Sequence, residues 1–232
     1  MPPRCLACGR ETATAEALCA SCWGELAFVA APVCGRCGLG LLAEGADVDD
    51  VCGACHAAPP RFDRARAALA YDDASRPIIL GFKHGGRLEA APLFVRWLEV
   101  AGGPLVTEAD LIAPVPLHWR RMLGRRFNQA AELARGLGRR TKTPYAPDLL
   151  LRPRPTPSQS GLSAAARRRN MAGAFALNPA WSDRLAGARV LLIDDVFTTG
   201  ATVERATAVL KRGGAAAVDI LTVARVERPR PI

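Results

Sequence analysis

The sequence predicts an α/β protein in which a mainly parallel sheet, flanked by helices, follows a small four-cysteine zinc-ribbon domain. Three observations support this prediction. All eight cysteines lie within the first 55 of the 232 residues. Beyond them, apolar runs typical of buried strands alternate with segments of helical periodicity. One of these runs ends on two adjacent aspartates followed by a cluster of hydroxyls, VLLIDDVFTTGAT (190–202).

The cysteines form four CxxC pairs, which predict two zinc ions. A CxxC turn directs two thiolates at one point, and two such turns complete a tetrahedral site. Glycine after Cys8, Cys37 and Cys52 lets backbone amides approach the sulfurs. The simplest pairing is sequential and groups Cys5, Cys8, Cys19 and Cys22 in one site and Cys34, Cys37, Cys52 and Cys55 in the other. An interleaved cross-brace is the alternative, because spacing alone does not determine connectivity.

Sites made only of cysteine are closed, so the predicted zinc ions are structural and serve folding and docking, not catalysis. Redox-active CxxC motifs are the competing interpretation, which four evenly spread pairs disfavour. His56 directly follows Cys55 and is either a substitute ligand or an exposed side chain.

The stretch HAAPPRFDRAR (56–66) predicts a boundary between a double zinc ribbon at 1–58 and a larger domain at 59–232, because the cysteines stop and two prolines intervene. In the larger domain, strands are expected at 65–71, 110–116, 188–195 and 217–226. Helices are expected at 75–87, 88–102, 125–140 and 201–215. The segment 152–175, rich in Pro, Ser and Arg, has the composition of a loop and leads into a short helix and a strand.

The formal net charge of +9 suggests an anionic partner such as a phosphate, a nucleotide or a nucleic acid. Of the 31 basic residues, 28 are arginine, and with so much Ala, Gly and Pro this is equally typical of a genome-wide coding bias. No apolar stretch approaches the length of a membrane span, and MPPRCLACGR lacks the apolar region of a signal peptide. We therefore expect a cytoplasmic protein without membrane insertion.

The two aspartates predict a sugar phosphate site. In a parallel sheet, ligands bind at the carboxyl ends of the strands, where Asp194 and Asp195 would lie. The segment 198–202 then begins a helix. Its free backbone amides and threonine hydroxyls can surround a phosphate, and Gly200 allows the ligand to come close to the backbone. A ribose 5-phosphate fits this arrangement. Ordinary helix capping explains the threonines but not two acids that end a buried strand.

The same stretch resembles the phosphoribosyl pyrophosphate (PRPP) motif of type I phosphoribosyltransferases. The chain as a whole is similar to the ComF family of competence and DNA-utilisation proteins, since FKHGG, APVPLHWRRMLGRRFNQAAELA and PSQSGLSAAARRRNMAGAF occur in the order of that family. This resemblance implies a type I phosphoribosyltransferase-like domain. One departure is Arg126 in RRFNQ, where the family pattern has glycine.

The resemblance implies three sets of site residues. The PRPP motif comprises Asp194, Asp195, Val196, Phe197, Thr198, Thr199, Gly200, Ala201 and Thr202. A pyrophosphate loop with Mg²⁺ comprises Pro114, Val115, Pro116, Arg120 and Arg121, with a proline-stiffened turn as the alternative. A flexible lid comprises Ser158, Gln159, Ser160, Gly161 and Arg167, where a solvated basic helix face is the alternative for the arginine.

Five further residues are candidates for the same site. Lys83 and His84 are expected to touch the pyrophosphate. Asn128 and Gln129 are either capping residues or site residues. His118 is either a general base or a surface histidine.

Two functions compete for this sequence. The first is a PRPP-binding phosphoribosyltransferase in DNA uptake or nucleotide metabolism, in which a base displaces pyrophosphate from the anomeric carbon. The second is a non-catalytic competence protein that handles single-stranded DNA and uses the fold either to sense PRPP or to bind DNA, with DNA-uptake helicases or processing proteins as partners. A zinc-dependent scaffold with a vestigial pocket is a third alternative. The sequence shows no signature for an acceptor base.

Overall fold

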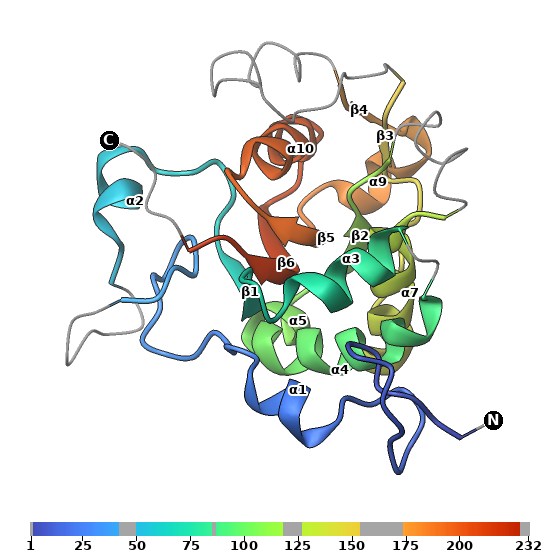
Figure 1. Ribbon diagram of the computed structural model, residues 1–232. Helices are drawn as coiled ribbons and strands as arrows, with labels where there is room; N and C mark the ends of the chain where they lie inside the picture. The colour runs from blue at the N-terminus through green and yellow to red at the C-terminus, as the bar shows by residue number, and fades with distance from the viewer. Residues whose placement is uncertain (1, 42–49, 85–86, 118–126, 154–173, 228–232) are drawn as a thin grey trace.

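The computed structural model describes residues 2–41, 50–84, 87–117, 127–153 and 174–227 (Figure 1). Its centre is a four-stranded sheet of order β1-β6-β5-β2 in which every pair is parallel. The strands are β1 (Ala65–Ala70), β2 (Leu111–Pro114), β5 (Arg189–Phe197) and β6 (Ala217–Arg225). All four strands were predicted, and the α/β fold class is confirmed.

Strand β5 is longer than expected. The prediction that it ends at the two aspartates is wrong, because pairing with β6 continues through Val196 opposite Ala224 and Phe197 opposite Arg225. Valine and phenylalanine are good strand formers, and β6 is long enough to pair with both. Asp194 and Asp195 therefore lie within a regular strand, and the predicted phosphate loop begins only after Phe197.

Helices cover both faces of the sheet (Figure 1). One face carries α3 (Arg76–His84), the 3₁₀ turn η1 (Leu88–Ala90), α4 (Ala91–Gly102), α5 (Pro104–Thr107) and α7 (Gln129–Thr141). The other carries α10 (Ala201–Arg212) and α9 (Ser182–Leu185), preceded by η2 (Pro179–Trp181). The predicted helices are confirmed, while α5 and α9 are too short to give a periodic signal.

The residues of β5 divide between two apolar cores. Leu191 and Ile193 pack with α3, α4 and α7, whereas Val190 and Leu192 pack with α10. This alternation follows from the period of two in a strand. Since both faces are buried, the strand forms an unbroken apolar run in the sequence.

Helix α3 is tied to the end of β1 by a short polar turn. Ser75 is fully buried and its hydroxyl donates to the Ala70 carbonyl at 2.7 Å. The Asp72 carboxylate accepts the Ser75 N–H at 2.8 Å, and the Asp72 N–H donates to the Ser75 hydroxyl at 3.0 Å. These reciprocal bonds fix the direction in which α3 leaves the sheet, and thereby the position of Lys83 near its end.

A cluster of ion pairs around one buried carboxylate lies at the opposite, amino-terminal edge of the sheet. The Asp219 side chain is 1 % exposed and accepts bonds from Arg64 Nε at 3.1 Å and Nη2 at 2.7 Å. Arg189 donates to the same carboxylate at 3.2 Å, and Glu108 accepts from Arg64 at 2.7 Å. The cluster joins β5 and β6 to the segment that enters β1.

The cysteine-rich head, with helices α1 (Ala20–Gly24) and α2 (Gly53–Ala57), packs on the edge of β1. The Val29 N–H donates to Ala68 O at 3.0 Å, and the Ala70 N–H donates to Ala27 O at 2.8 Å, which is an antiparallel pairing. The rings of Trp23 and Phe28 pack against Trp97 of α4 at centroid distances of 5.9 and 5.4 Å, the first tilted and the second edge to face. The head therefore shares an interface with the sheet.

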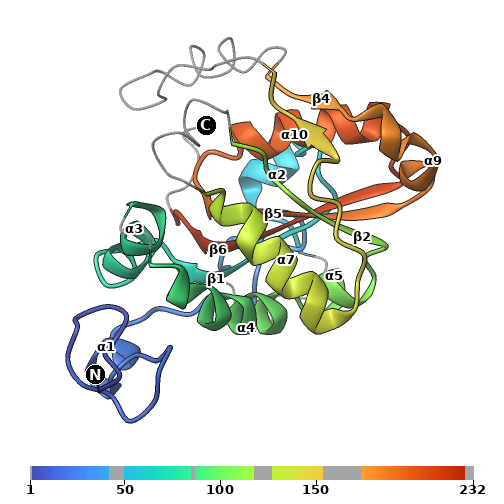
Figure 2. The ribbon, with the colours of Figure 1, turned by 90° about the vertical axis from the view of Figure 1, so that its right-hand side faces the viewer.

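A small antiparallel ribbon of β3 (Leu150–Leu151) and β4 (Ala176–Leu177) lies apart from the main sheet (Figure 2). It brings together the two flanks of the segment 154–173, since Leu151 pairs with Ala176.

Among the described segments, none of the helices combines the length and the hydrophobicity needed to cross a bilayer.

Candidate functional site

The four parallel strands end at one edge of the sheet, and most of the described candidate residues gather there. Strand β2 ends at Pro114, opposite Ile193 of β5, so the predicted pyrophosphate loop starts beside Asp194. The predicted phosphate loop, Thr198–Thr202, leaves the same edge from Phe197. Parallel topology therefore brings together segments that lie about 80 residues apart in the sequence.

The two aspartates differ in their partners. Asp195 Oδ1 lies 3.0 Å from Lys83 Nζ, and both side chains are less than one-fifth exposed. Asp194 Oδ1 accepts the N–H of Asp195 at 2.8 Å. Burial, and then the neighbouring charge of Asp195, raises the pKa of Asp194 to about 7, although the charges of Lys83 and Arg152 oppose the shift. The site thus holds Asp194, whose charged form is disfavoured, next to Asp195, whose charge is balanced by Lys83.

The predicted phosphate loop turns sharply into α10. Gly200 has φ of 75°, in the left-handed region, and its carbonyl accepts the Glu204 N–H at 2.9 Å. Thr198 and Thr199 are exposed, and Thr199 Oγ1 lies 3.4 Å from the Ala201 N–H. The first amides of a helix have no acceptor within the helix, and the helix dipole favours negative charge at such an end.

Replacing Gly200 with alanine tests this loop geometry. A Cβ at positive φ costs about 1 kcal/mol, and the loop relieves the strain by moving. We expect Gly200→Ala to lower the Tm by about 3 °C and to weaken anion binding about tenfold. Ala201→Gly, next along the chain but within the helix, is the comparison for stability. A Gly200→Ala protein with wild-type Tm and affinity would contradict the role of the turn.

The described part of the predicted pyrophosphate loop is anchored on both sides. The Val115 N–H donates to Ile193 O at 2.9 Å, and Asn128 Nδ2 donates to Val115 O at 3.1 Å. Val115 is buried and Pro116 is half-buried. Arg120, Arg121 and His118 lie outside the described residues. The loop therefore starts from a fixed base next to the aspartates.

The two polar residues that open α7 have separate roles. Asn128 caps the helix, accepting the Ala130 N–H at 3.1 Å, so the capping interpretation is confirmed for it. Gln129 is 1 % exposed, and its Nε2 donates to Lys83 O at 2.8 Å. Gln129 thus fixes the backbone of the lysine that pairs with Asp195. His84 ends α3, and its side chain lies outside the described residues.

Arg152 lies at this candidate site, although in the sequence it is only one residue of a segment rich in Pro, Ser and Arg. Its Nη1 lies 3.4 Å from Pro116 O, and its guanidinium lies 5.3 Å from the Phe175 ring centroid. Its charge opposes the raised pKa of Asp194. The feature of the sequence that could have identified Arg152 as a site residue is its position directly after β3. The lid residues Ser158, Gln159, Ser160, Gly161 and Arg167 lie outside the described residues.

The eight cysteines form two groups with the predicted sequential pairing. The sulfurs of Cys5, Cys8, Cys19 and Cys22, and those of Cys34, Cys37, Cys52 and Cys55, lie within 4.8 Å of one another in each group. The cross-brace alternative is therefore excluded. His56 is exposed and belongs to neither group.

The groups have the geometry of tetrahedral zinc sites. Sulfur separations are 3.8 Å for Cys8–Cys19 and 3.7 Å for Cys37–Cys52. A tetrahedron with zinc–sulfur bonds of about 2.3 Å has edges of about 3.8 Å. The Cys37 and Cys52 N–H groups lie 3.4 and 3.3 Å from Cys34 Sγ, as amides do around metal-bound thiolates. The residues present therefore fit structural zinc.

Backbone N–H groups lower the pKa of one cysteine thiol in each group. Burial raises the pKa of Cys5, but N–H groups of Cys8, Cys19 and Ala7 outweigh it and bring the pKa to about 6. The same competition brings the pKa of Cys34 to about 7. One thiolate per group is thus available at neutral pH to start binding a cation.

Removing zinc tests this assignment. We expect about two zinc ions per chain, and a fall of Tm of about 10 °C or more when a strong chelator removes them under reducing conditions. Cys8→Ser and Cys37→Ser should each retain about one ion, because each breaks one group. Elemental analysis gives the count. Full zinc content in both variants, or disulfides in the native protein, would contradict two four-cysteine sites.

Two protein-family models match parts of the chain. Residues 1–56 match the double zinc ribbon domain, and residues 159–231 match the phosphoribosyl transferase domain.

Two solved structures are similar to part of the chain. An orotate phosphoribosyltransferase from Aeropyrum pernix is 18 % identical with a TM-score of 0.38, and 68 % of each chain is covered. An allosteric regulatory enzyme of purine biosynthesis is 18 % identical with a TM-score of 0.42, covering 62 % of this chain and 30 % of that one.

Two curated relatives extend over nearly the whole chain. DNA utilization protein YhgH of Escherichia coli (strain K12) is 32 % identical, with 95 % of this chain and 89 % of the relative covered. Competence protein F of Haemophilus influenzae (strain ATCC 51907 / DSM 11121 / KW20 / Rd) is 29 % identical, with 96 % of each covered. The chain therefore belongs to the ComF family of double zinc ribbon and phosphoribosyltransferase-domain proteins, together with YhgH and competence protein F.

Proposed function

We propose that this protein binds PRPP at the carboxyl edge of its sheet. The observation that carries the proposal is the juxtaposition of Asp194 and Asp195 with the start of α10, one short turn further along the chain. Carboxylates accept hydrogen bonds from the ribose 2′ and 3′ hydroxyls, and the loop amides with the threonine hydroxyls accommodate the 5-phosphate. The phosphoribosyl transferase domain of the family supports this assignment.

Lys83 exchanges partners in this proposal. Without ligand, its ammonium lies 3.0 Å from Asp195. Ribose hydroxyls that bind Asp195 release the ammonium toward the pyrophosphate, beside Arg152 and the loop after Pro114. Mg²⁺ would accompany the pyrophosphate as a counter-ion with oxygen ligands. The site thus changes from an internal ion pair to a set of cations around the leaving group.

The chemistry that such a site supports is transfer of the phosphoribosyl group. The bond between the anomeric carbon and the pyrophosphate oxygen breaks, and pyrophosphate leaves with the electron pair. A nitrogen lone pair of the acceptor forms the new bond. Cationic side chains stabilise the leaving charge, and the aspartates hold the sugar as its ring gains positive character. Among the described residues, none forms an evident acceptor-base pocket.

The names of the relatives point to the biological setting. YhgH is a DNA utilization protein, and the Haemophilus protein is a competence protein. We propose that this chain likewise serves DNA uptake or the use of its nucleotides, in the cytoplasm and with DNA-processing partners.

Thermal denaturation in the presence of ligands tests PRPP binding. PRPP with Mg²⁺ at about 100 times its Kd should stabilise the fold by about 2.7 kcal/mol, which raises the Tm by about 5–10 °C. Ribose 5-phosphate and pyrophosphate, each alone, should give smaller shifts because each fills half of the site. ATP is the control for non-specific attraction of phosphates. Equal shifts for ATP and PRPP, or none for PRPP, would defeat the proposal.

A second candidate function is contact with single-stranded DNA. Trp23 and Phe28 are 49 % and 40 % exposed, their ring centroids are 5.1 Å apart, and the chain carries a net charge of +9. Exposed aromatic rings stack on bases, at about 1–3 kcal/mol per base. Trp23→Ala should weaken binding to an oligothymidylate about tenfold. Unchanged affinity, or affinity that does not depend on salt, would argue against this function.

A further inference from the structure

The residue that precedes the predicted phosphate loop is held from three directions. Phe197 ends β5, and Thr198 follows it. The Phe197 carbonyl accepts the Val226 N–H at 2.9 Å. Its ring packs edge to face on Phe62 at 5.9 Å, and the Arg225 guanidinium lies 5.4 Å from the ring centroid. The start of the loop therefore depends on Arg225 as well as on the sheet.

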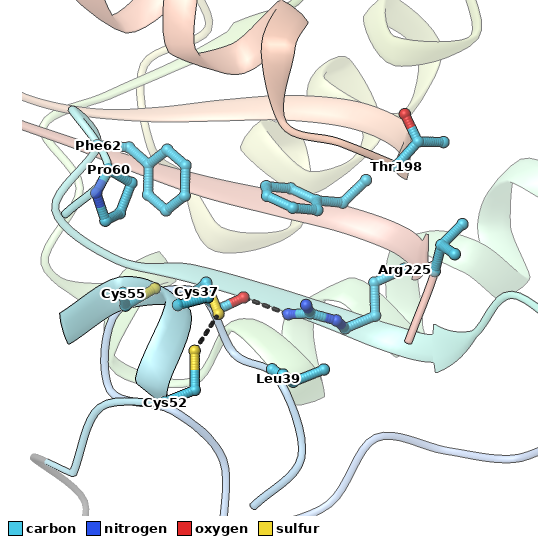
Figure 3. Close-up of a pocket in the computed structure, with 11 residues that line it drawn as sticks. Cys37, Leu39, Cys52, Cys55, Pro60, Phe62, Thr198 and Arg225 are labelled. Atoms are coloured by element: carbon cyan, nitrogen blue, oxygen red, sulfur yellow. Dashed lines mark hydrogen bonds between the residues drawn. The ribbon is translucent and has the colours of Figure 1, made fainter. Parts of the chain in front are cut away.

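Arg225 also holds the second zinc-ribbon cluster, which comprises Cys34, Cys37, Cys52 and Cys55. Arg225 is 5 % exposed, and its Nη1 donates to the Cys37 carbonyl. Figure 3 shows Arg225 extending from the end of its strand to Cys37, with Cys52 just beyond. One guanidinium thus contacts both a zinc-ligand residue and the aromatic ring at the base of the loop.

The cluster and the loop also share the walls of one small cavity. Cys37, Cys52, Cys55, Arg225 and Thr198 line it, and its volume is about 40 Å³ (Figure 3). This volume accommodates about three water molecules, which is too little for a nucleotide base. The cavity is therefore part of the contact between the cysteine cluster and the loop and is not a ligand site.

The charge of the zinc-bound cluster stabilises its contact with Arg225. Four thiolates around one Zn²⁺ carry a net charge of about −2, so a buried cation beside them is stabilised. Arg66 supplies a second cation: its Nη1 lies 3.4 Å from Cys34 O and 3.1 Å from Gly35 O. Arg66 bonds the same cluster from β1, and its remaining hydrogen bond goes to its neighbour Ala65. It therefore offers a matched comparison for Arg225.

We propose that Arg225 is a positioning residue that couples zinc in the second cluster to the order of the predicted phosphate loop. Without zinc, the four sulfurs no longer hold the Cys37 turn in place, and Arg225 loses its anchor. The Phe197 ring then loses its cover, and the amides after Thr198 lose their fixed direction. Where the loop binds the 5-phosphate of PRPP, as proposed above, linkage requires the reverse effect, so that bound PRPP slows the loss of zinc.

The first test needs no PRPP and stands apart from the proposed function. Hydrogen exchange is followed by mass spectrometry in the zinc-loaded protein, in Arg225→Gln and in Arg66→Gln. We expect amides of the peptide spanning 198–203 to exchange at least about fivefold faster in Arg225→Gln only. Arg225→Lys, which keeps a donor and a charge, should restore most of the protection. Equal exchange in the two glutamine variants would overturn the proposal.

The second test uses PRPP and a colorimetric zinc chelator. Bound PRPP should slow the release of one of the two zinc ions about fivefold or more in wild type, and this effect should vanish in Arg225→Gln. Arg66→Gln should bind PRPP with a Kd within about twofold of wild type, while Arg225→Gln binds about tenfold more weakly. PRPP that binds wild type without slowing zinc release overturns the coupling. A wild type that does not bind PRPP defeats the proposed function. The exchange test, repeated on wild type after zinc has been removed, then decides the coupling, because unchanged exchange of the 198–203 peptide without zinc would overturn it.

Discussion

Replacing Asp194 with asparagine should strongly weaken PRPP binding and at the same time stabilise the free protein. The carboxyl is half-buried next to Asp195, which raises its pKa to about 7. Asparagine keeps the shape and the oxygen that accepts the Asp195 N–H, but it carries no charge. We expect affinity for PRPP to fall at least about 100-fold, because the ribose hydroxyls lose a charged acceptor.

The gain in stability should depend on pH in a defined direction. The folded state holds the Asp194 proton more tightly than the unfolded chain, whose pKa is near the ordinary 3.8. Stability of the wild type is therefore lost as pH rises from about 4 to about 7, and asparagine avoids this loss. Near pH 4 the two proteins should be alike, whereas at pH 8 the variant should be more stable by about 2–4 kcal/mol, where the upper figure corresponds to the full shift in pKa.

Urea unfolding at pH 4.5 and pH 8 measures this difference. Asp195→Asn is the comparison, since it breaks the ion pair with Lys83 and should not stabilise the fold. An Asp194→Asn protein that is less stable than wild type at pH 8 would show that the carboxyl supports the fold and is not stressed by it.

The second large effect is expected at the opposite edge of the sheet. Asp219→Ala removes the buried carboxylate that Arg64 and Arg189 share. Two guanidinium groups then face one another without their buried counter-ion. Because both arginines retain some access to water, we expect a loss of about 2–4 kcal/mol and a fall in Tm of about 5–12 °C.

Glu108→Gln is the matched control for this prediction. Glu108 bonds Arg64 from the surface, with its side chain 45 % exposed, and exposed ion pairs contribute little to stability. Calorimetry should show nearly wild-type unfolding for this variant. Both variants should bind PRPP with wild-type affinity, because both positions lie at the opposite edge of the sheet from the site. An Asp219→Ala protein as stable as Glu108→Gln would mean that the arginines are fully solvated in the native state.

The sheet and its main helices were predictable from the sequence because each obeys one strong local rule. Both faces of the sheet are covered, so β5 and β6 are continuous apolar runs. Helices α7 and α10 have apolar faces of period 3.6, and α7 has an asparagine cap. The CxxC turns also act locally, which is why the sequential pairing of the cysteines was the simplest interpretation.

The contacts that complete the candidate site depend on distant segments and were not predictable. Gln129 bonds the backbone of Lys83, 46 residues earlier. Arg225 and Cys37 are 188 residues apart, and nothing in a run of strand residues marks the last one as an anchor for the head. The same reason applies to Arg152, whose partner Pro116 lies 36 residues earlier.

A calorimetric titration with PRPP is the most direct test of the proposed site. It compares wild type, with and without Mg²⁺, to the double variant Asp194→Asn/Asp195→Asn. We predict a Kd on the order of 10 µM, about −7 kcal/mol, for zinc-loaded wild type with Mg²⁺ and no measurable heat for the double variant. Absence of binding by folded, zinc-loaded wild type, or equal binding by the double variant, would contradict a PRPP site at this edge of the sheet.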